Sequence, residues 1–541
     1  MLRLGKSAAL IFCVFFLYSA PGFAATSIPF TINLSKAVNV TGTPRIALDV
    51  GGITPPRYAT YTSGSGTSTL IFTYTMVAGD VDLDGISLAA SIDLNGGTIK
   101  DLAGNDLSPL TFTAPNTTNV KVNYPSLGMD FVYDADGRYT LNGTVYNDLI
   151  SFLSAAGGTF TRASVGTYYD ITGALQTAAS GVPRFDYNPI THAAKGVLIE
   201  ESRTNLLTKS EEFDDAIYAK TGVSITPNIL TAPNGTMTAD KMIEGAAGTF
   251  HNITYTVSLS SNVLRTVSIY AKAGERNWIR IQADDGNTTS ANANFDLSAG
   301  VVGNTSVGGA ATVSSSISPA GNGWYKCMMT YTLTSATTTR IIYILRTGDG
   351  TGTSSYSGNG TSGAYFWGAQ LEQGAFATSY IPTTTATVTR AADVLMIPTA
   401  GWYTSTKGTF YGQYFLGNTS TNARAVSISS GAAPFTINNP VNSAQWRNWS
   451  GASGPTATSP IIPTFTTAMK AAAAWDDTGP VSTISASGSA VVTGTYTAGA
   501  YNGTSISVGA GSGAFFLDAP IRQLKYYPIR VSDTQLQLLT Q

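Results

Sequence analysis

Runs in which apolar and polar residues alternate recur along most of the chain. In the run "WYKCMMTYTL", residues 324–333, one face carries Tyr325, Cys327 and Leu333 together with Met329 and Tyr331. A two-residue period is typical of a strand that buries one face. The runs "RTVSIYAKA" and "TRIIYILRT" follow the same pattern. These runs predict many short strands and place Cys327 in a hydrophobic core.

Turn signals separate these runs and favour an all-β chain. Asn-Gly pairs, which supply the positive φ angles of hairpin turns, occur at Asn95-Gly96, Asn142-Gly143, Asn234-Gly235, Asn359-Gly360 and Asn502-Gly503. The chain is also rich in Ser, Thr and Gly and poor in Leu, Lys and Glu, which disfavours long amphipathic helices. One helix is predicted, at the C-terminus, where Ser532 caps the amide of Gln535 and Leu536 and Leu539 dock on a sheet.

The first 25 residues are typical of a secretory signal peptide. Arg3 and Lys6 precede the apolar run 8–17, and the small-residue site Gly22-Phe23-Ala24 follows it. No later stretch approaches about 20 uninterrupted apolar residues, so we expect no membrane span in the mature chain. Cys327 is then the only cysteine of the mature chain, which excludes an intrachain disulfide. We expect a secreted or cell-surface protein of a bacterium.

A chain of 541 residues exceeds what one hydrophobic core usually serves, so three or four domains are expected. Breakers and changes in composition divide the sequence after the signal peptide into four parts. They predict a strand-rich domain at 26–124, a connector with short strands at 125–207, a third segment at 208–393 and a fourth at 394–541.

Three resemblances to known families cover most of these parts. The first part, with "INLSKAVNVTGTPRIALDVGG" and "LNGGTIKDLAGNDL", resembles the immunoglobulin-like repeats of bacterial surface and adhesion proteins, which are β-sandwich spacers. The stretches "SGVPRFDYNPITHAAKGVLIEESRTNLLTKSEEF", "YAKAGERNWIRI" and "YFWGAQLEQGAFATSYIPTTTATVTRAADV" resemble a module of phage and prophage tail- or head-fibre proteins. That module is a jelly roll similar to carbohydrate-binding modules.

The last part, with "AAAAWDD" and "IRQLKYYPIRVSDTQLQLLT", resembles the concanavalin A-like (laminin-G-like) sandwich that follows the module in such proteins. Together the resemblances imply tandem β-sandwiches. Phage fibres assemble in the cytoplasm, so the export signal departs from that family. We interpret the chain as a fibre-type array on, or secreted from, a bacterial cell.

Charge and histidine content exclude several function classes. The net charge of -2 gives no basic field for a phosphate backbone, so we expect no nucleic-acid partner. The two histidines, His192 and His251, lie in separate segments, which disfavours a histidine-based triad or a zinc site. We expect both histidines in turns or on the surface.

The stretch "GVLIEESRTNLLTKSEEF", residues 196–213, concentrates charge in a chain of which only 11% is charged. Its charged residues are Glu200, Glu201, Arg203, Lys209, Glu211 and Glu212. Because the stretch stands at the entrance to the jelly roll in the family it resembles, we expect these charges to pair across a junction between domains. Catalysis by this cluster is the alternative.

A short acidic motif raises the possibility of calcium. Asp80, Asp82, Asp84 and Gly85 spell the oxygen-rich start of a calcium loop. Ser91 stands where the closing bidentate Glu of an EF-hand belongs. The alternative is a polar β-turn without a cation.

Aromatic residues in polar surroundings are the candidates for sugar binding, since aromatic rings stack on the apolar faces of pyranoses. The candidates are Trp446, Arg447, Asn448 and Trp449 in "SAQWRNWSGASG", together with the loop residue Tyr356. The alternative for the tryptophan pair is an edge-strand or interface role. Trp324, Trp367 and Trp475 lie in apolar or alternating runs and are expected in cores, and Trp278 falls between these cases.

These features favour an exported, non-enzymatic protein that binds a glycan or cell-surface polysaccharide. One alternative is a structural fibre, appendage or prophage tail-fibre subunit, with homo-oligomers. A second is a polysaccharide hydrolase, which needs two carboxylates across a cleft. Its candidates are Glu200, Glu201, Glu275, Asp284, Asp285, Glu372, Asp476 and Asp477.

Overall fold

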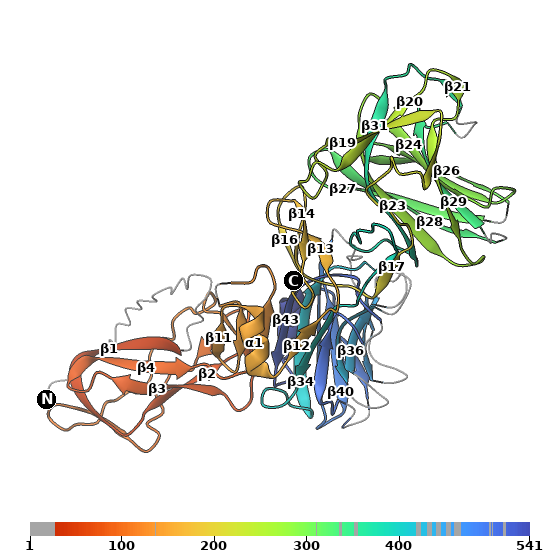
Figure 1. Cartoon of the computed structure of the whole chain (residues 1–541). Helices are drawn as coiled ribbons and strands as arrows, with labels where there is room; N and C mark the ends of the chain where they lie inside the picture. Colours follow the sequence, from red (N-terminus) through yellow and green to blue (C-terminus); the bar gives the residue numbers. More distant parts are fainter. Residues whose placement is uncertain are drawn as a thin grey trace.

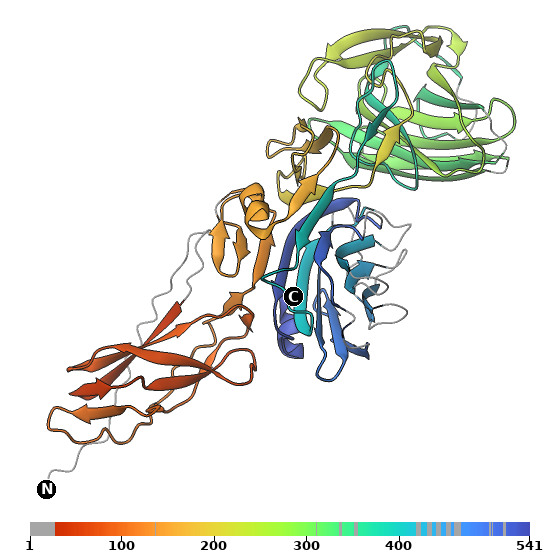
Figure 2. The ribbon, with the colours of Figure 1, turned by 60° about the horizontal axis from the view of Figure 1, so that its bottom comes forward.

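The computed structural model describes residues 27–541 except 136, 310, 335–337, 351–354, 418–422, 430–434, 440–444, 451–455, 459–466, 497–498, 500 and 512–514. For 429, 435–436, 438–439, 445–450 and 456–458 it describes the backbone alone. The described residues form 43 strands and two short helices. Three β-structured bodies make up an elongated molecule (Figures 1 and 2). The predicted all-β fold of tandem sandwiches is confirmed.

The N-terminal domain is built on a six-stranded sheet in the order β6-β2-β3-β4-β1-β7. Its strands are β1 (Ser27–Thr41), β2 (Arg45–Asp49), β3 (Arg57–Ser63), β4 (Thr67–Thr75), β6 (Ser87–Leu88) and β7 (Thr98–Asp101). The register of β1 against β4 shifts between Asn33 and Val38, and from Val38 to Thr41 strand β1 also pairs with β7. A second sheet, β5 (Asp80–Asp82) with β8 (Val122–Tyr124), adds Val122 to the buried core. The immunoglobulin-like assignment of this domain stays a prediction.

The jelly-roll domain consists of two facing six-stranded sheets. The sheet that we call the β24 sheet has the order β18 (Tyr218–Thr221), β22 (Asn252–Ser258), β29 (Thr338–Arg346), β24 (Trp278–Asp284), β25 (Ser290–Asp296) and β26 (Val301–Gly308). The β23 sheet has the order β19 (Val223–Leu230), β20 (Ala239–Glu244), β31 (Gly363–Gln373), β23 (Arg265–Ala273), β28 (Trp324–Leu333) and β27 (Ala311–Pro319).

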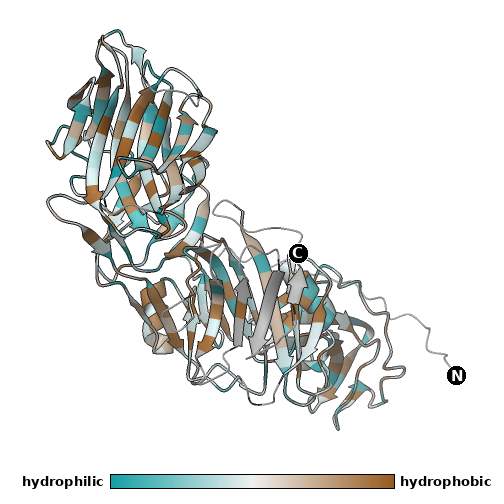
Figure 3. Ribbon diagram, turned by 90° about the vertical axis from the view of Figure 1, so that its right-hand side faces the viewer, coloured by the Kyte–Doolittle hydropathy of each residue, from teal (hydrophilic) through white to brown (hydrophobic). Residues whose placement is uncertain are grey.

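The core of the jelly roll lies between these sheets. Hydrophobic and hydrophilic residues alternate along several of its strands (Figure 3). Ile281 and Tyr343 enter it from the β24 sheet, and Cys327, Met329 and Tyr331 enter it from β28. Cys327 is fully buried, and its thiol is free. The two-residue period therefore predicted both the strand and its buried face correctly.

The terminal sandwich combines a ten-stranded sheet with a seven-stranded one. The larger, the β34 sheet, runs β11 (Thr144–Tyr146), β10 (Tyr139–Leu141), β9 (Leu127–Asp130), β43 (Ala519–Tyr527), β34 (Lys407–Tyr414), β39 (Met469–Asp476), β40 (Val481–Ala486) and β41 (Val492–Thr495), with β16 (Ala194–Ile199) on β43 and β15 (Phe185–Tyr187) on β16. The smaller, the β35 sheet, runs β12 (Thr159–Thr161), β33 (Val394–Pro398), β42 (Ser505–Val508), β35 (Ala423–Ser429), β36 (Phe435–Asn439), β37 (Gln445–Ser450) and β38 (Thr456–Thr458).

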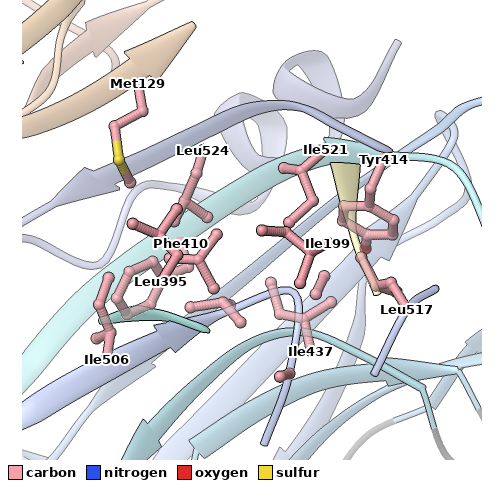
Figure 4. Close-up of a cluster of buried hydrophobic side chains, with 14 of the residues drawn as sticks. Met129, Ile199, Leu395, Phe410, Tyr414, Ile437, Ile506, Leu517, Ile521 and Leu524 are labelled. Atoms are coloured by element: carbon pink, nitrogen blue, oxygen red, sulfur yellow. The ribbon is translucent and has the colours of Figure 1, made fainter. Parts of the chain in front are cut away.

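The core of this sandwich mixes residues from both ends of the chain. Met129 and Ile199 pack with Leu395, Ile521 and Leu524 (Figure 4). Phe410 and Tyr414 from β34 lie in the same cluster. The segments that precede and follow the jelly roll in the sequence therefore contribute to one hydrophobic core.

The structure differs here from the predicted division, in which 125–207 is a connector. Strand β9 pairs Met129 with Leu524, and β16 pairs Val197 with Ile521. These strands of four and six residues have partners hundreds of residues away, which a local pattern does not reveal. The strands within 127–161 and 185–199 belong to the sheets of the terminal sandwich, and the jelly roll is inserted into it.

The insertion begins and ends in a two-stranded stem. Strand β17 (Arg203–Asn205) pairs antiparallel with β32 (Val388–Arg390), and Arg203 lies opposite Arg390. The hairpin β13 (Gly166–Tyr169) and β14 (Leu175–Ala178) packs on the outer face of the β23 sheet, where Leu175 joins a cluster with Trp324 and Trp367. The remaining two-stranded sheet pairs β21 (Gly248–Thr249) with β30 (Tyr356–Ser357).

The two helices cover the terminal sandwich. Helix α1 (Leu149–Ala156) is capped by Asp148 and buries Phe152 in the core. Helix α2 (Asp533–Thr540) is capped by Ser532, whose side chain accepts from the amide of Gln535, and it buries Leu536 and Leu539. The predicted C-terminal helix is confirmed. None of the helices within the described residues is long and apolar enough to cross a membrane.

Candidate functional site

Polar side chains form a ladder on the outer face of the β24 sheet over β24, β25 and β26, whereas β29 adds the buried Ile342 and Ile344 opposite Gln282 and Arg280. Since Ile281 and Tyr343 point into the core, their neighbours in sequence point outward. In one cross-strand row, Gln282 lies opposite Asn292, and Asn292 lies opposite Ser306. All three side chains are half-buried. The row offers two amides and a hydroxyl, which donate and accept hydrogen bonds.

The next row of the ladder joins amide and ionic groups. Asp284 lies opposite Arg340 on β29 and opposite Ser290 on β25. The Nε of Arg340 donates to Oδ1 of Asp284 at 2.6 Å, and the Nε2 of Gln282 donates to Oδ2 at 2.6 Å. The Arg340 side chain keeps 42% of its surface exposed. This hydrogen bond to Asp284 is the main reason that the pKa of Arg340 is raised.

A loop after β29 forms a wall beside the ladder. Arg280 donates to Oδ1 of Asn294 at 2.8 Å and to the carbonyl of Gly350 at 2.8 Å. Asn294 in turn donates to Oδ1 of Asp349 at 3.1 Å, and Asp349 also accepts from the amide of Asn304 at 2.6 Å. Burial and the nearby cation of Arg346 lower the pKa of Arg280 to about 10. These bonds fix the loop against the sheet.

An indole stands at the end of the ladder. Trp278 is half-buried and lies opposite Arg346 on β29 and Asp296 on β25. Its ring packs on Gly303, where an added Cβ would lie 2.6 Å from Cζ3 of the indole. The same Cβ would lie 2.1 Å from Oδ1 of Asp349, so a larger residue at Gly303 would displace the carboxylate as well as the ring. The face thus combines amides, hydroxyls, balanced charges and one aromatic ring.

Tyr356 lies near this wall but has partners of its own. Its hydroxyl donates to Oε2 of Glu244 at 2.7 Å, and its ring lies 4.4 Å from that of His251. Arg276 donates to both oxygens of Glu244 at 2.6 Å. Although burial raises the pKa of Glu244, the hydrogen bonds from Arg276 and Tyr356 bring it down to about 2. Tyr356 therefore links Glu244 on β20 to His251, which directly precedes β22.

The other sugar-binding candidates lie in a different domain. Trp446, Arg447, Asn448 and Trp449 belong to β37, where Trp449 lies opposite Thr436 and Trp446 opposite Ala457. Their side chains lie outside the described residues. The structure therefore does not bring the tryptophan pair together with Tyr356, and the assignment stays a prediction.

The three aspartates of the predicted calcium loop face different partners. Asp80 forms an ion pair with Arg57 at 2.6 Å and accepts from the hydroxyl of Tyr74. Asp82 accepts from the amides of Gly51 and Gly85, and Asp84 accepts from Nε2 of Gln535 in α2 at 2.5 Å. No group of three or more His, Cys, Asp or Glu within the described ranges is arranged to hold a metal ion. This donor set does not fit one cation.

The acidic motif instead ties the N-terminal domain to the terminal sandwich. Gln535 also accepts from the amide of Leu83 at 2.8 Å. Val81 and Leu83 pack into a cluster with Tyr527 and Leu536. Polar and apolar contacts therefore coincide at this interface.

Of the clustered charges, Glu200 pairs at the junction between the terminal sandwich and the jelly roll, as predicted, whereas Glu201 pairs with Arg203 and Lys209 with Glu212 within the stretch itself. Glu200 is 1% exposed, forms an ion pair with Arg184 at 2.8 Å and accepts from the amide of Ser379 at 2.7 Å. Asp393 pairs with Arg162 at 2.9 Å and with Arg184. Arg390 adds a third buried guanidinium. Although burial raises the pKa of Glu200, Arg390 and Arg184 bring it down to about 2.

A small cavity lies beside this network. It has a volume of about 20 Å³ and is lined by Val165, Tyr380, Pro382, Val388 and Arg390, among others. That volume holds about one water molecule. The cavity is too small to take a sugar ring.

The hydrolase candidates are spread over separate surroundings. Glu372 is buried and accepts from the amide of Thr378 at 2.9 Å, and Asp477 accepts from the hydroxyl of Tyr496. Glu275 pairs with Lys241. Asp284 faces Arg340, as described above. Each of these carboxylates is held by its own protein donor.

One histidine lies where the sequence predicts it and the other does not. His192 is exposed in a turn with a φ of 58°. The expectation for His251 is wrong, because its side chain is fully buried at the start of β22. Its two ring nitrogens lie near the carbonyl oxygens of Gly222 and Tyr356. Burial is possible because both nitrogens have polar partners.

Neither a protein-family model nor a curated protein sequence matches the chain. Parts of it are similar to solved structures. The IT-sialidase CBM40 of Ruminococcus gnavus, bound to α2,3-sialyllactose, is 16% identical over 25% of this chain and 83% of its own, with a TM-score of 0.22. Domain 4 of the Geobacillus stearothermophilus arabinanase AbnA, in complex with arabinotriose, is 15% identical over 31% of this chain and 83% of its own, with a TM-score of 0.23.

Domains LG4-5 of the mouse laminin α1 chain are 14% identical over 52% of this chain and 88% of their own, with a TM-score of 0.21. Identities and TM-scores at this level carry no inference about what the chain binds. The chemistry of the site has to be judged from its own residues.

Sequence reasoning did not find the ladder on the β24 sheet. Its residues lie in the runs "WIRIQAD" and "SANANFD", where polar residues alternate with Ile281 and Ala293, both of which face the core. The polar half of such a pattern is usually a solvated face. The outward-facing positions of these two runs carry Arg, Gln and Asn in place of Ser, Thr and Lys. This concentration of hydrogen-bonding side chains is the signal that could have indicated a binding face.

Proposed function

We propose that this chain is an exported, non-enzymatic glycan-binding protein and that the outer face of the β24 sheet is its binding surface. The ligand is a polysaccharide or the glycan of a cell surface. The N-terminal domain and the terminal sandwich hold the jelly roll away from the point of attachment. Weak binding at single sites gains strength when several copies act together.

The observation that carries this proposal is the row Gln282–Asn292–Ser306 beside Asp284 and Arg340. Sugar hydroxyls both donate and accept, and amide, carboxylate and guanidinium groups match them. A strand presents such side chains in a fixed order, so the spacing of the donors is set before a ligand arrives. Trp278 adds a ring at the end of the row.

The absence of catalysis is part of the proposal. A glycosidase needs one carboxylic acid and one carboxylate across a sugar, with room between them for the reaction. Three carboxylates lie on or beside this face, and each accepts from donors of the protein. Arg340 and Gln282 donate to Asp284, the amide and hydroxyl of Ser298 donate to Asp296, and the amide of Asn304 donates to Asp349. Holding a sugar by hydrogen bonds requires no further group.

A glycan array tests this function. The purified chain should bind a restricted set of glycans, and the double variant Gln282→Ala, Asn292→Ala should lose binding by at least about tenfold, since each polar contact is worth roughly 1 kcal/mol. Asn39→Ala is the matched control, because Asn39 is an exposed strand amide of the N-terminal domain. Folded protein that binds no glycan would refute the proposal.

A structural fibre or appendage subunit is the second candidate. It is favoured by the elongated arrangement of the three bodies (Figure 1) and by the buried contacts at both domain junctions. Size-exclusion chromatography with light scattering separates the two functions. A strict monomer argues against the fibre, and defined homo-oligomers or filaments favour it.

A further inference from the structure

The outer face of the β34 sheet carries a polar row in a domain other than that of the β24 face. Since Tyr414 points into the core of the terminal sandwich, its neighbour Gln413 points outward. Gln413 lies opposite Lys470 on β39 and opposite Gln523 on β43. Gln523 in turn lies opposite Asp130 on β9 and donates to its Oδ2 at 3.1 Å. This row, which we call the Gln413 row, therefore offers two amides between a carboxylate and an ammonium.

Lys525 adds a second ammonium beside this row. It lies two residues along β43 from Gln523 and opposite Tyr411, whose ring centroid is 5.8 Å from its Nζ. Lys525 is half-buried, and within the described residues it forms no ion pair. Burial lowers the pKa of Lys525, the charge of Asp130 raises it, and the cation of Lys470 lowers it again. A cation that is partly withdrawn from water and lacks a counter-ion is stabilised by an anion that binds next to it.

Protein carboxylates do not balance the charge on this face. Among the described residues of the two rows that contain Lys470 and Lys525, Asp130 is the single carboxylate, and it pairs with Arg138 at 2.9 Å. Lys470 donates to the main-chain oxygen of Gln541 at 2.8 Å. The described part of this face therefore carries an excess of positive charge, in a chain whose net charge is -2.

Arg522 brings a further cation close to Lys525. The register of β34 against β43 shifts between Gln413 and Tyr414, which leaves Arg522 as an extra residue of β43. Its side chain is half-buried. Burial chiefly raises the pKa of Tyr411, and the nearby charge of Arg522 opposes this rise. Arg522 and Lys525 therefore both lie near the Tyr411 side chain.

The Gln413 row lies beside the elements that cover the rest of this face. Helix α2 and the N-terminal domain pack in one apolar cluster that contains Ala472 and Ala474 of β39. Lys470, Gln413 and Gln523 lie outside that cluster, and each of them is half-buried. Part of each side chain is thus open to solvent and can contact a ligand.

We propose that the Gln413 row, together with Lys525 and Arg522, binds an acidic polysaccharide. A carboxylate or sulfate group of the polymer accepts charge-assisted hydrogen bonds from Lys525 and Arg522. Sugar hydroxyls next to that group donate to and accept from the amides of Gln413 and Gln523. The amides favour a sugar over a polyanion without hydroxyl groups. This site lies on another domain than the β24 face and goes beyond the proposed function.

Isothermal titration calorimetry with the full chain at 0.15 M salt tests the site. The probes are polygalacturonate and dextran sulfate, which carry carboxylate and sulfate groups. At least one of them should bind, and the polymer that binds shows which acidic group the site takes. Poly-L-glutamate, which carries carboxylates but no hydroxyl groups, should bind at least about tenfold more weakly. The proposal is overturned if neither polysaccharide binds or if poly-L-glutamate binds equally well.

Variants locate the bound polymer. Lys525→Met removes the charge of a half-buried side chain and should weaken binding at least about tenfold. Gln413→Glu places a carboxylate in the middle of the row and should weaken binding by at least as much, because it repels the polymer. Circular dichroism confirms that each variant is folded. Unchanged affinity in both variants overturns the site.

The matched control is Lys407→Met. Lys407 is exposed on the same strand, opposite Asp476, and the strand rise places it about 14 Å from Tyr411. Because 0.15 M salt screens exposed charges beyond about 8 Å, the affinity should change by less than about twofold. A loss as large as that of Lys525→Met would show that only the net charge matters, which overturns the site.

The double variant Gln282→Ala, Asn292→Ala separates this site from the proposed function. It should bind the acidic polysaccharide as the natural sequence does, since its substitutions lie on the β24 face. Loss of binding in this variant would place the polymer on the β24 face and overturn the second site. If the glycan array shows no binding at the β24 face, the proposed function fails, while the titrations still judge this site.

Discussion

The guanidinium of Arg184 lies 2.8 Å from the carboxylate of Glu200, and both side chains are buried at the point where the chain leaves the terminal sandwich for the jelly roll. Arg184 also pairs with Asp393, which stands where the chain returns. Arg184 therefore contacts both segments of the chain that pass between the terminal sandwich and the jelly roll. Glu200 also accepts from the amide of Ser379, which follows β31 of the jelly roll, so the cluster contacts the inserted domain.

Removing the charge of Glu200 is expected to destabilise this junction. Glu200→Gln keeps the size of the side chain but leaves three buried guanidinium groups with Asp393 as their main counter-charge. An uncompensated buried charge costs roughly 3 to 5 kcal/mol. Urea unfolding should show a loss of that order. The control is Glu212→Gln, whose exposed pair with Lys209 should change the free energy of unfolding by less than about 1 kcal/mol.

Asp518 gives the junction a distinct dependence on pH. Burial, and then the charges of Glu201 and Glu200, raise the pKa of Asp518 well above the ordinary value of 3.8. The folded chain therefore keeps a proton that the unfolded chain releases, so this group makes the free energy of unfolding fall as pH rises above about 4. Asp518→Asn should remove that contribution. The variant should gain stability relative to the natural sequence at pH 8 compared with pH 5, and an unchanged difference would contradict the assignment.

The contact between Asp84 and Gln535 is expected to stabilise the docking of the N-terminal domain. Asp84→Ala and Gln535→Ala should each lower the free energy of unfolding by about 1 kcal/mol. Because the two side chains bond to each other at 2.5 Å, the double variant should lose less than the sum of the two. Strict additivity in the urea titrations would show that the contact does not couple the domains.

Calcium provides a separate test of the same segment. Since Asp80, Asp82 and Asp84 are engaged by different protein donors, millimolar calcium should leave the melting temperature unchanged. A ligand that binds only the folded state raises that temperature. A rise that Asp82→Asn abolishes would therefore restore the calcium loop that the sequence predicts.

The sequence predicts what depends on neighbouring residues. Alternation placed Cys327 in the core, and the Ser532 cap and the apolar Leu536 and Leu539 defined the last helix. These features follow from the period of a strand or a helix and from local capping. They need no knowledge of the rest of the chain.

The sequence does not predict contacts between distant segments. The strands around Met129 and Val197 look like pieces of a connector, because their partners Leu524 and Ile521 lie near the other end of the chain. His251 is buried only because Gly222 and Tyr356 bring two carbonyl oxygens to its ring. The ladder on the β24 sheet likewise depends on the register of β24 with β25 and β29.

The central claim concerns where the glycan binds, and hydrogen exchange with and without the glycan tests it most directly. The predicted result is slower exchange confined to β24, β25 and β26, residues 278–308, and to the wall at 346–350. Slower exchange in 435–458 instead would place the site on the strand of Trp446 and Trp449. That result, or no change in either region at a saturating glycan concentration, would contradict the account.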